Sequence, residues 1–307
     1  MQSINGIILL DKPSGITSNR ALQRVRALIK AKKGGHTGSL DPFATGMLPL
    51  CFGEATKISH YLLNEKKTYL VEVRLGISTS TGDIDGEITG NSKIKEYPED
   101  QWRKILNEFK GKSEQIPPMH SALRYKGKRL YELARKGEIV DRAAREIEVF
   151  SIDLVDLSKN TINFEITCSK GTYIRVLAED IAKKLGMLAH VSRLRRKSVG
   201  NFCENKMVKL SILEDLTQNS NLTISDYFIT IDEALTEFSV VNLNNLQSSK
   251  FRNGQQLELN GYFDDNVKVY DHNSNLVGIA YKKKSKHISS QENFSFKLIF
   301  HHHIFLY

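Results

Sequence analysis

The hydrophobic residues of this chain repeat with two periods, which predict its strands and helices. Residues 67–77 alternate, so that the odd-numbered side chains from Tyr69 to Ile77 share one face and the even-numbered ones share the other. This pattern predicts a strand with one buried face. Residues 162–168 alternate in the same way. The apolar run 7–10 and the basic stretch 190–197 also predict strands.

Two segments in the first part of the chain have the period of amphipathic helices. Thr17 or Ser18 can cap a helix whose apolar face runs up to Ile29. Residues 98–110 predict a second helix with Trp102 on its apolar face, and Gly111 is expected to stop it.

A third amphipathic segment carries an arginine in an unfavourable place. Thr172 can cap this helix and Gly186 can end it. Arg175 then lies in the first turn, where the positive end of the helix dipole disfavours a cation. A carboxylate that meets Arg175 would explain it. The alternative is a surface pair with Glu179, worth about 0.3–0.5 kcal/mol.

The amino-acid composition of the chain changes near residue 240. Before it, residues 78–90 are rich in Ser, Thr, Gly and Asp and predict a loop. After it, the chain is polar and Asn-rich, and short apolar runs predict a small all-β appendage with strands at 267–270, 276–280 and 296–300. We therefore expect two domains, 1–240 and 241–307. The run His301–His303 is short and supports no metal site.

Composition narrows the class of protein only a little. The 307 residues include Lys+Arg 44 and Asp+Glu 35, a net charge of +9, which slightly favours a polyanionic partner over a simple aid to solubility. The 3 cysteines form no CxxC pair, which argues against a disulfide framework and a cysteine metal site. The apolar piece at 6–10 is too short for a signal peptide, and no run approaches the roughly 20 residues of a membrane helix. We expect a soluble, cytoplasmic protein.

A glycine-rich loop at 34–46, GGHTGSLDPFATG, contains a single carboxylate, Asp41. Asp41 followed by Pro42 is typical of a helix N-cap, but Gly46 and Pro49 would make the following helix poor. The glycine spacing matches neither a P-loop nor a dinucleotide-binding loop, and no third metal ligand accompanies His36 and Asp41. Composition alone therefore leaves a cap and a functional carboxylate about equally favoured.

Residues 35–57, GHTGSLDPFATGMLPLCFGEATK, resemble almost letter for letter the catalytic motif of the bacterial tRNA pseudouridine-55 synthases, the TruB family. The likeness continues in the family's order over residues 5–202. It includes DKPSG at 11–15, KTY at 67–69, HSAL at 120–123, GTYIR at 171–175 and HVSRLRR at 190–196.

The resemblance implies a fold and a reaction. The fold would be α+β, a pseudouridine synthase domain on a large mixed, mainly antiparallel sheet with its site in a cleft across the middle. A small C-terminal PUA-like β-barrel would bind RNA. The reaction would isomerise uridine 55 in the T-loop of tRNA by base flipping, cleavage of the glycosidic bond and joining of C5 to C1′. No metal or organic cofactor would be needed.

The resemblance also assigns roles to residues. Asp41 would be the nucleophile, Tyr69 would stack on the flipped base near the C5 proton, and Arg175 would pair with Asp41. Substrate contacts would come from His36, Tyr173, Lys12, Lys57 and Leu194. A basic insertion near 120–148 would clamp the RNA, so that the RNA-binding residues would be Arg124, Lys126, Lys128, Arg129 and Arg193.

Several alternatives stay open at this stage. Periodicity alone makes Tyr69 a core residue, the basic segment 124–136 a solvated helix face, and 190–197 an exposed basic strand edge. Ser80 stands where the family usually has Asp, which predicts weaker support for the loop. The chain could also act on another RNA, or be an RNA-binding or RNA-folding module without activity.

The sequence does not decide whether Asp41 attacks C1′, attacks the base or assists elimination. We expect tRNA, through its T-arm, as the partner. We expect no membrane, no obligatory protein partner and a monomer.

Overall fold

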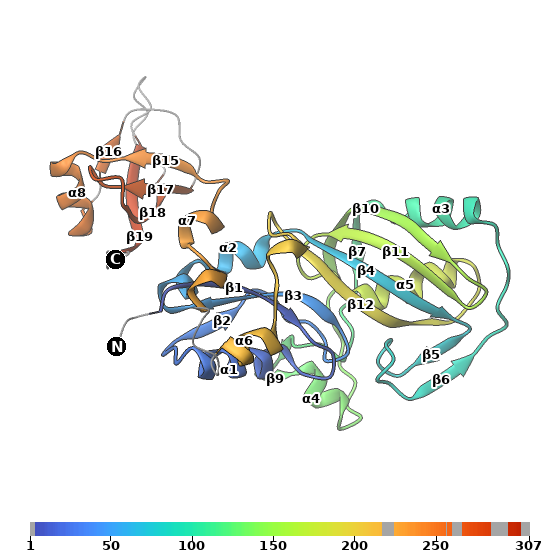
Figure 1. Cartoon of the computed structure of the whole chain (residues 1–307). Helices are drawn as coiled ribbons and strands as arrows, with labels where there is room; N and C mark the ends of the chain where they lie inside the picture. Colours follow the sequence, from blue (N-terminus) through green and yellow to red (C-terminus); the bar gives the residue numbers. More distant parts are fainter. Residues whose placement is uncertain (1–3, 217–223, 256, 260–265, 284–293, 302–307) are drawn as a thin grey trace, which may run out of the picture. The chain divides into compact units, whose positions relative to one another are not determined.

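The computed structural model describes residues 4–216, 224–255, 257–259, 266–283 and 294–301 (Figure 1). The chain divides into two compact units. The larger comprises Ile8–Cys51 and Ser59–Tyr227, and the smaller comprises Met1–Ile7, Phe52–Ile58 and Phe228–Tyr307. His302 and His303, from the run noted in the sequence, lie outside the described residues.

The larger unit is built on one large sheet. Its strands are β1 (Gly6–Lys12), β2 (Gly34–His36), β3 (Thr45–Phe52), β4 (Lys67–Leu75), β7 (Gly111–Gln115), β10 (Arg145–Leu157), β11 (Thr161–Cys168), β12 (Ala189–Val199) and β13 (Val208–Lys209). The strand order is β13-β1-β3-β12-β4-β11-β10-β7, with β2 paired to β3 (Figure 1). The pairs β12–β3 and β1–β13 are parallel, whereas β12–β4, β4–β11, β11–β10 and β10–β7 are antiparallel. The expected large mixed, mainly antiparallel sheet is therefore confirmed.

The helices of the larger unit are short. They are α1 (Ser18–Leu28), α2 (Ser59–Asn64), α3 (Glu99–Asn107), α4 (Leu130–Ala134), α5 (Ile174–Lys184) and α6 (Leu210–Leu216), with 3-10 turns η2 (Glu204–Lys206) and η3 (Ile224–Tyr227). No helix in the described ranges is long and apolar enough to cross a membrane.

One hydrophobic core joins α3 and α5 to the middle of the sheet. The predicted alternation on β4 is confirmed, because Tyr69, Val71, Val73 and Leu75 are all buried. They pack with buried residues of β10, β11 and β12 and with Trp102 of α3. Burial of each such side chain contributes about 1.5–3 kcal/mol, so this core fixes the strands that carry the site.

The observed helix boundaries show which local sequence signals correctly predicted where a helix begins or ends. Thr17 caps α1 as predicted, and its hydroxyl oxygen accepts a hydrogen bond from the Arg20 amide at 3.1 Å. Gly186, at a φ of +69°, follows the end of α5 as predicted. The second helix ends at Asn107, earlier than expected, and Gly111 begins β7 instead of stopping the helix.

The prediction that Thr172 caps α5 is wrong. The N-cap residue is Tyr173, and its amide donates to the Gln115 side-chain oxygen at 2.8 Å. The Gln115 amide group donates back to the Tyr173 carbonyl at 3.1 Å, while the Thr172 hydroxyl donates to the carbonyl of Ser169. A side chain from β7 therefore fixes the backbone of the N-cap residue of α5, which no pattern local to the helix could indicate.

Two further local predictions need correction. Residues 78–90 are not simply a loop, because β5 (Ile77–Thr79) and β6 (Ile88–Asn91) pair as a short hairpin. The basic stretch 190–197 is not an exposed edge, because β12 lies between β3 and β4 in the sheet. Arg196 on β12 is 1% exposed.

The smaller unit contains an open five-stranded sheet. Its elements are η1 (Gly53–Ile58), β14 (Phe228–Ile229), α7 (Ile231–Ala234), β15 (Ser239–Asn242), α8 (Asn245–Arg252), β16 (Leu257–Leu259), β17 (Asn266–Tyr270), β18 (Leu276–Lys283) and β19 (Phe294–His301). The order of the sheet is β15-β17-β18-β19-β16, and the described strands do not close into a barrel. The three strands expected from the sequence are confirmed, and Phe251 of α8 packs with Val267, Val269 and Val277 in a core of its own.

Gly46 gives a direct test of how β3 is fixed against β12. Its φ is +98°, and an added Cβ would lie 2.3 Å from the backbone oxygen of Arg196. Gly111 has a similar φ of +96° with nothing within 4 Å. We predict that Gly46→Ala lowers the free energy of unfolding by about 2–4 kcal/mol, against about 1–2 kcal/mol of backbone strain for Gly111→Ala. Urea unfolding measures both, and equal losses would contradict the close approach.

Candidate active site

A cavity of about 640 Å³ lies over the centre of the large sheet. Its lining comes from segments 38–41, 121–123, 145–147 and 169–175, together with Leu63, Lys67, Tyr69, Leu194 and Arg196. Tyr69 is on β4 and Leu194 on β12, neighbouring strands in the middle of the sheet. The expected cleft across the middle of the sheet is therefore present, and the glycine-rich loop forms one wall of it.

Asp41 caps no helix. The loop makes a single turn, in which the Ala44 amide donates to the Asp41 carbonyl at 3.1 Å, and β3 begins directly at Thr45. The capping interpretation is therefore wrong.

The loop is held by side chains from the N-terminal DKPSG motif and the start of α1. Lys12 donates to the Pro42 carbonyl at 3.2 Å, and Ser14 donates to the Phe43 carbonyl at 2.9 Å. The Ser18 hydroxyl accepts from the Leu40 amide at 2.7 Å. The backbone is thus fixed on both sides of Asp41.

Arg175 is the buried cation that faces Asp41. It is the second residue of α5 and is only 4% exposed. Its Nε lies 3.0 Å from Asp41 Oδ2, and its Nη1 lies 3.3 Å from Asp83 Oδ2. It also donates to the carbonyls of Thr81 at 2.6 Å and His120 at 2.8 Å. The prediction that Arg175 meets a carboxylate is confirmed, and the alternative of a surface pair with Glu179 is wrong.

Asp83 is a second carboxylate beside Arg175, and the predicted site did not include it. It is 5% exposed, accepts from the Thr81 hydroxyl at 2.6 Å and from the Asp85 amide at 3.1 Å, and pairs with Arg175. Ser80, the departure from the family pattern, is exposed and accepts from the Glu87 amide at 3.1 Å. The hairpin therefore keeps a carboxylate for Arg175 without an Asp at position 80.

The electrostatic state of Asp41 reflects two opposed effects. Its side chain is 38% exposed where it lines the cavity, but protein surrounds the carboxylate closely. Desolvation raises the pKa of Asp41 above its ordinary value, and the Arg175 cation lowers it in part. Arg175 thus favours the ionised carboxylate inside a pocket that disfavours it.

Two tyrosines and a leucine give the cavity its apolar walls. Burial raises the pKa of Tyr69 and also that of Tyr173, so both phenols stay protonated near neutral pH. Tyr69 is 9% exposed and belongs to the hydrophobic core, so its interpretation as a core residue is also correct. Leu194 is 7% exposed and lines the same cavity.

Two buried lysines support the walls through backbone carbonyls. Lys12 is fully buried and donates to the carbonyls of Pro13 and Ile16, each at 2.8 Å, as well as to Pro42. Lys67, which the site prediction did not include, donates to the carbonyls of Leu63 and Glu65. Desolvation lowers the pKa of both lysines to about 8. Lys67 shares a face with Tyr69, so the alternation of β4 could have indicated it.

Arg196 is a further buried cation absent from the predicted site. Its Nε donates to the Met47 carbonyl at 2.6 Å and its Nη2 to the Gly38 carbonyl at 3.0 Å. These carbonyls lie on the two sides of Asp41 in the chain, so one guanidinium ties both ends of the loop. The period of two along β12 places Arg196 with Leu194, which is the signal that could have identified it.

The remaining predicted residues lie outside the cavity lining. His36 is half-buried with no partner for its Nδ1, and burial lowers its pKa. Lys57 lies on η1 and pairs with Glu54 at 2.5 Å. Arg193 is 84% exposed and lies 3.7 Å from Glu72.

The basic segment after the HSAL motif forms a hairpin and a short helix. Strands β8 (Arg124–Tyr125) and β9 (Lys128–Arg129) pair with each other, and α4 follows directly. The side chains of Arg124, Lys126, Lys128 and Arg129 are all exposed. The segment with β9 and α4 extends away from the sheet in Figure 1. The helix-face interpretation is thus wrong for 124–129, where the basic residues lie on a hairpin.

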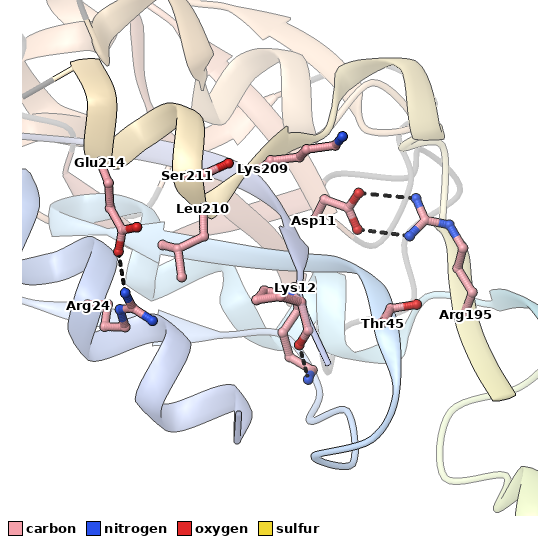
Figure 2. Close-up of a pocket in the computed structure, with 10 residues that line it drawn as sticks. Asp11, Lys12, Arg24, Thr45, Arg195, Lys209, Leu210, Ser211 and Glu214 are labelled. Atoms are coloured by element: carbon pink, nitrogen blue, oxygen red, sulfur yellow. Dashed lines mark hydrogen bonds and ion pairs between the residues drawn. The ribbon is translucent and has the colours of Figure 1, made fainter. Parts of the chain in front are cut away.

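A second cavity of about 430 Å³ lies between β1, β12 and α6 (Figure 2). Four of its charged groups form two ion pairs with one another. Arg195 binds both oxygens of Asp11 at 2.9 and 3.2 Å, and Arg24 binds Glu214 at 2.6 Å. These pairs join elements across the cavity, so we interpret its lining as structural. Within the described residues, no group of three or more His, Cys, Asp or Glu side chains could hold a metal ion.

Comparison with known proteins gives consistent matches over most of the chain. Residues 26–174 match the TruB family pseudouridylate synthase N-terminal domain, and residues 175–236 match the tRNA pseudouridylate synthase B C-terminal domain. The chain is 46% identical to tRNA pseudouridine synthase B of Nitrosococcus oceani, with 84% of each protein covered. It is 43% identical to tRNA pseudouridine synthase B of Dechloromonas aromatica, with 91% of this chain and 92% of that protein covered.

Solved structures share the fold at low sequence identity. The chain superposes on a structure titled Crystal Structure of a Cbf5-Nop10-Gar1 Complex with a TM-score of 0.73 at 22% identity, covering 96% of this chain and 85% of the other. An archaeal box H/ACA sRNP Nop10-Cbf5 complex gives a TM-score of 0.69 at 23% identity, covering 96% and 86%. The likeness shows a common fold.

Removing the Arg175 guanidinium tests whether it holds together the segments that contain Asp41, Asp83 and His120. We predict that Arg175→Met lowers the free energy of unfolding by about 3–5 kcal/mol, because it leaves the buried Asp83 carboxylate without its cation. Arg103→Met breaks an exposed helical pair with Glu99 and should cost less than about 1 kcal/mol. Chemical unfolding of both variants measures the difference. Similar small losses would show that Arg175 is not a structural centre.

Proposed function

The chain belongs to the TruB family of pseudouridylate synthases, and we propose that it isomerises uridine 55 in the T-loop of tRNA to pseudouridine. The observation that carries this proposal is the pair between Asp41 and buried Arg175 in a cavity that also contains Tyr69. The fold is that of the pseudouridine synthases. The cavity, at about 640 Å³, falls within the range of sites that enclose one small ligand.

The reaction requires the target uridine to leave its stack and enter the protein. Extrusion of a base costs a few kcal/mol, and stacking on an aromatic side chain returns about 1–3 kcal/mol. In our proposal Tyr69 provides that face, with Tyr173 and Leu194 enclosing the base from other sides. His36 contacts the RNA where the nucleotide leaves the stack.

Asp41 is the nucleophilic carboxylate in this scheme. Cleavage of the N1–C1′ bond leaves the bonding electrons on uracil and a deficit on the sugar, which a carboxylate can stabilise or trap. Arg175 keeps Asp41 ionised and aimed despite the desolvation that raises its pKa. An enclosed cavity also limits hydrolysis of the intermediate by water.

The second half of the reaction forms a carbon–carbon bond. The uracil turns, C5 joins C1′, the C5 proton departs and N1 gains a proton, so the product is an isomer of the substrate. We propose that Tyr69, whose phenol is protonated, relays the proton that leaves C5. All of these steps use groups of the protein and the RNA, and our scheme requires no cofactor.

Binding of the RNA would extend beyond the cavity. We assign phosphate contacts to the exposed residues Arg124, Lys126, Lys128 and Arg129 of the hairpin and to Arg193. Lys12 supports the pocket through the loop carbonyl that it binds, and Lys57 adds an outer contact.

We propose a catalytic domain over 1–240 and a PUA-like RNA-binding domain over 241–307. The short paired strands of the second segment and their own apolar core support its independence. We infer a cytoplasmic monomer that needs no other protein, since a tRNA already supplies a large partner surface.

The nucleophile can be tested with a T-arm stem-loop RNA. We predict that Asp41→Asn reduces pseudouridine formation by at least about 10³-fold, because an amide cannot replace the carboxylate. Asp85→Asn changes an exposed carboxylate nearby and should retain activity. Product from Asp41→Asn at the wild-type rate would refute the assignment. Binding without product by the wild type would favour an RNA-folding module, and product only from other RNAs would change the substrate.

The role of the basic β8–β9 hairpin can be tested through the salt dependence of RNA binding. We predict that Lys126→Ala with Arg129→Ala weakens binding of the stem-loop and flattens the plot of log K against log salt. The slope should fall by about 0.7–0.9 for each phosphate that the protein no longer neutralises. The matched control is Arg103→Ala with Lys104→Ala, which removes two exposed cations from α3. A slope equal to that of the wild type would refute a clamp.

A further inference from the structure

Ser121 stands out among the residues that line the active-site cavity. It is 5% exposed, and its hydroxyl oxygen is buried without a hydrogen-bond partner in the protein. A buried polar group left unsatisfied costs about 1–3 kcal/mol. Such a group in a native fold needs an explanation, and a catalytic or binding role is one of them.

The backbone holds Ser121 firmly at this place. Its amide donates to the Met119 carbonyl at 2.9 Å, and its carbonyl accepts from the Tyr131 amide at 3.1 Å. The preceding carbonyl, that of His120, accepts from Arg175 at 2.8 Å. The guanidinium that binds Asp41 therefore also holds the backbone directly before Ser121.

Two of the cations that line the cavity, Arg175 and Lys67, are largely occupied. Arg175 directs all five of its N–H groups at Asp41, Asp83 and two backbone carbonyls. Lys67 gives two of its three N–H bonds to carbonyls of its own segment. An extruded uracil presents two carbonyl oxygens and one N–H, so it needs donors that these cations do not have to spare.

The competing partner of Ser121 is the phenol of Tyr173. A hydrogen-bond interaction with Ser121 partly offsets the rise that burial causes in the Tyr173 pKa, so the two hydroxyl groups are near each other. No hydrogen bond of ordinary length and angle joins them. The serine hydroxyl is thus free to turn toward a ligand.

We propose that Ser121 is a substrate-binding residue whose hydroxyl donates a hydrogen bond to a carbonyl oxygen of the extruded uracil. This assignment rests on the proposed function, because it takes the cavity as the uridine site. A flipped base is generally read by stacking and by hydrogen bonds to its polar edge. In our scheme Tyr69 supplies the stacking, and Ser121 supplies one of the hydrogen bonds to the polar edge of the base.

The first experiment compares Ser121→Ala with the wild type on the T-arm stem-loop. Loss of one hydrogen bond between neutral groups should lower kcat/KM about fivefold to tenfold. Ser248, 4% exposed and likewise without a hydroxyl partner, does not line the cavity. Ser248→Ala is the control for stability, and both variants should keep the wild-type unfolding temperature or exceed it.

The second experiment changes the RNA and so does not depend on the folding of a variant. The stem-loop is made with 2-thiouridine or 4-thiouridine at the target position, since sulfur is a weaker acceptor than oxygen. Ser121→Ala should lower kcat/KM about fivefold to tenfold on the uridine RNA, but less than about twofold on one of the two thio-RNAs.

The outcomes separate this inference from the function on which it rests. An unchanged kcat/KM for Ser121→Ala, or an equal loss on all three RNAs, would overturn the role of Ser121 while the wild type still forms product. A wild type that forms no pseudouridine from the uridine RNA would instead overturn the proposed function.

Discussion

The geometry of the site depends on one guanidinium. Arg175 connects the start of α5 to the Asp41 loop, to the turn that contains Thr81 and Asp83, and to the carbonyl of His120. These three segments are not strands of the large sheet where they meet the guanidinium. The turn that contains Asp83 is tied to β12 by one backbone hydrogen bond, from the Val191 amide to the Gly82 carbonyl at 3.0 Å. Burial strengthens each of the interactions, because little water competes for the N–H groups. The sheet thus places the residues roughly, and Arg175 sets how the loops meet over it.

Much of the fold could be predicted from local pattern. The alternation over 67–75 and 162–168 is the burial pattern of β4 and β11, and Thr17 and Gly186 mark real helix boundaries. The predictions that failed depend on partners distant in the sequence. Gln115 binds the backbone of the N-cap residue of α5 across 58 residues of sequence, and β12 became an interior strand because β3 and β4 flank it. The grouping of segments 1–7 and 52–58 with the C-terminal part likewise leaves no periodic signal.

The site shows the same division between local and distant information. The motifs pointed to Asp41, Tyr69 and Arg175, and the structure brings all three into one cavity. Asp83 and Arg196 were missed because their importance lies in what they contact. Asp83 is one acid among 35 until Arg175 is placed against it, and Arg196 is one base in a basic strand until its side chain meets Gly38 and Met47. A local signal was also ambiguous for Asp41, since the same Asp-Pro pair can begin a helix or a tight turn.

The shared guanidinium has a consequence for how such a sequence can change over time. Asp41, Asp83 and Arg175 contact one another as a unit, so the effects of replacing them do not add. A change at Arg175 alone leaves buried negative charge unbalanced. A change at Asp83 alone removes one of the two carboxylates that balance the charge of Arg175. Any series of single substitutions that replaces Arg175 with a different cation therefore includes a less stable variant. Drift is therefore far more restricted here than at the exposed hairpin, where each basic residue can be exchanged independently of its neighbours.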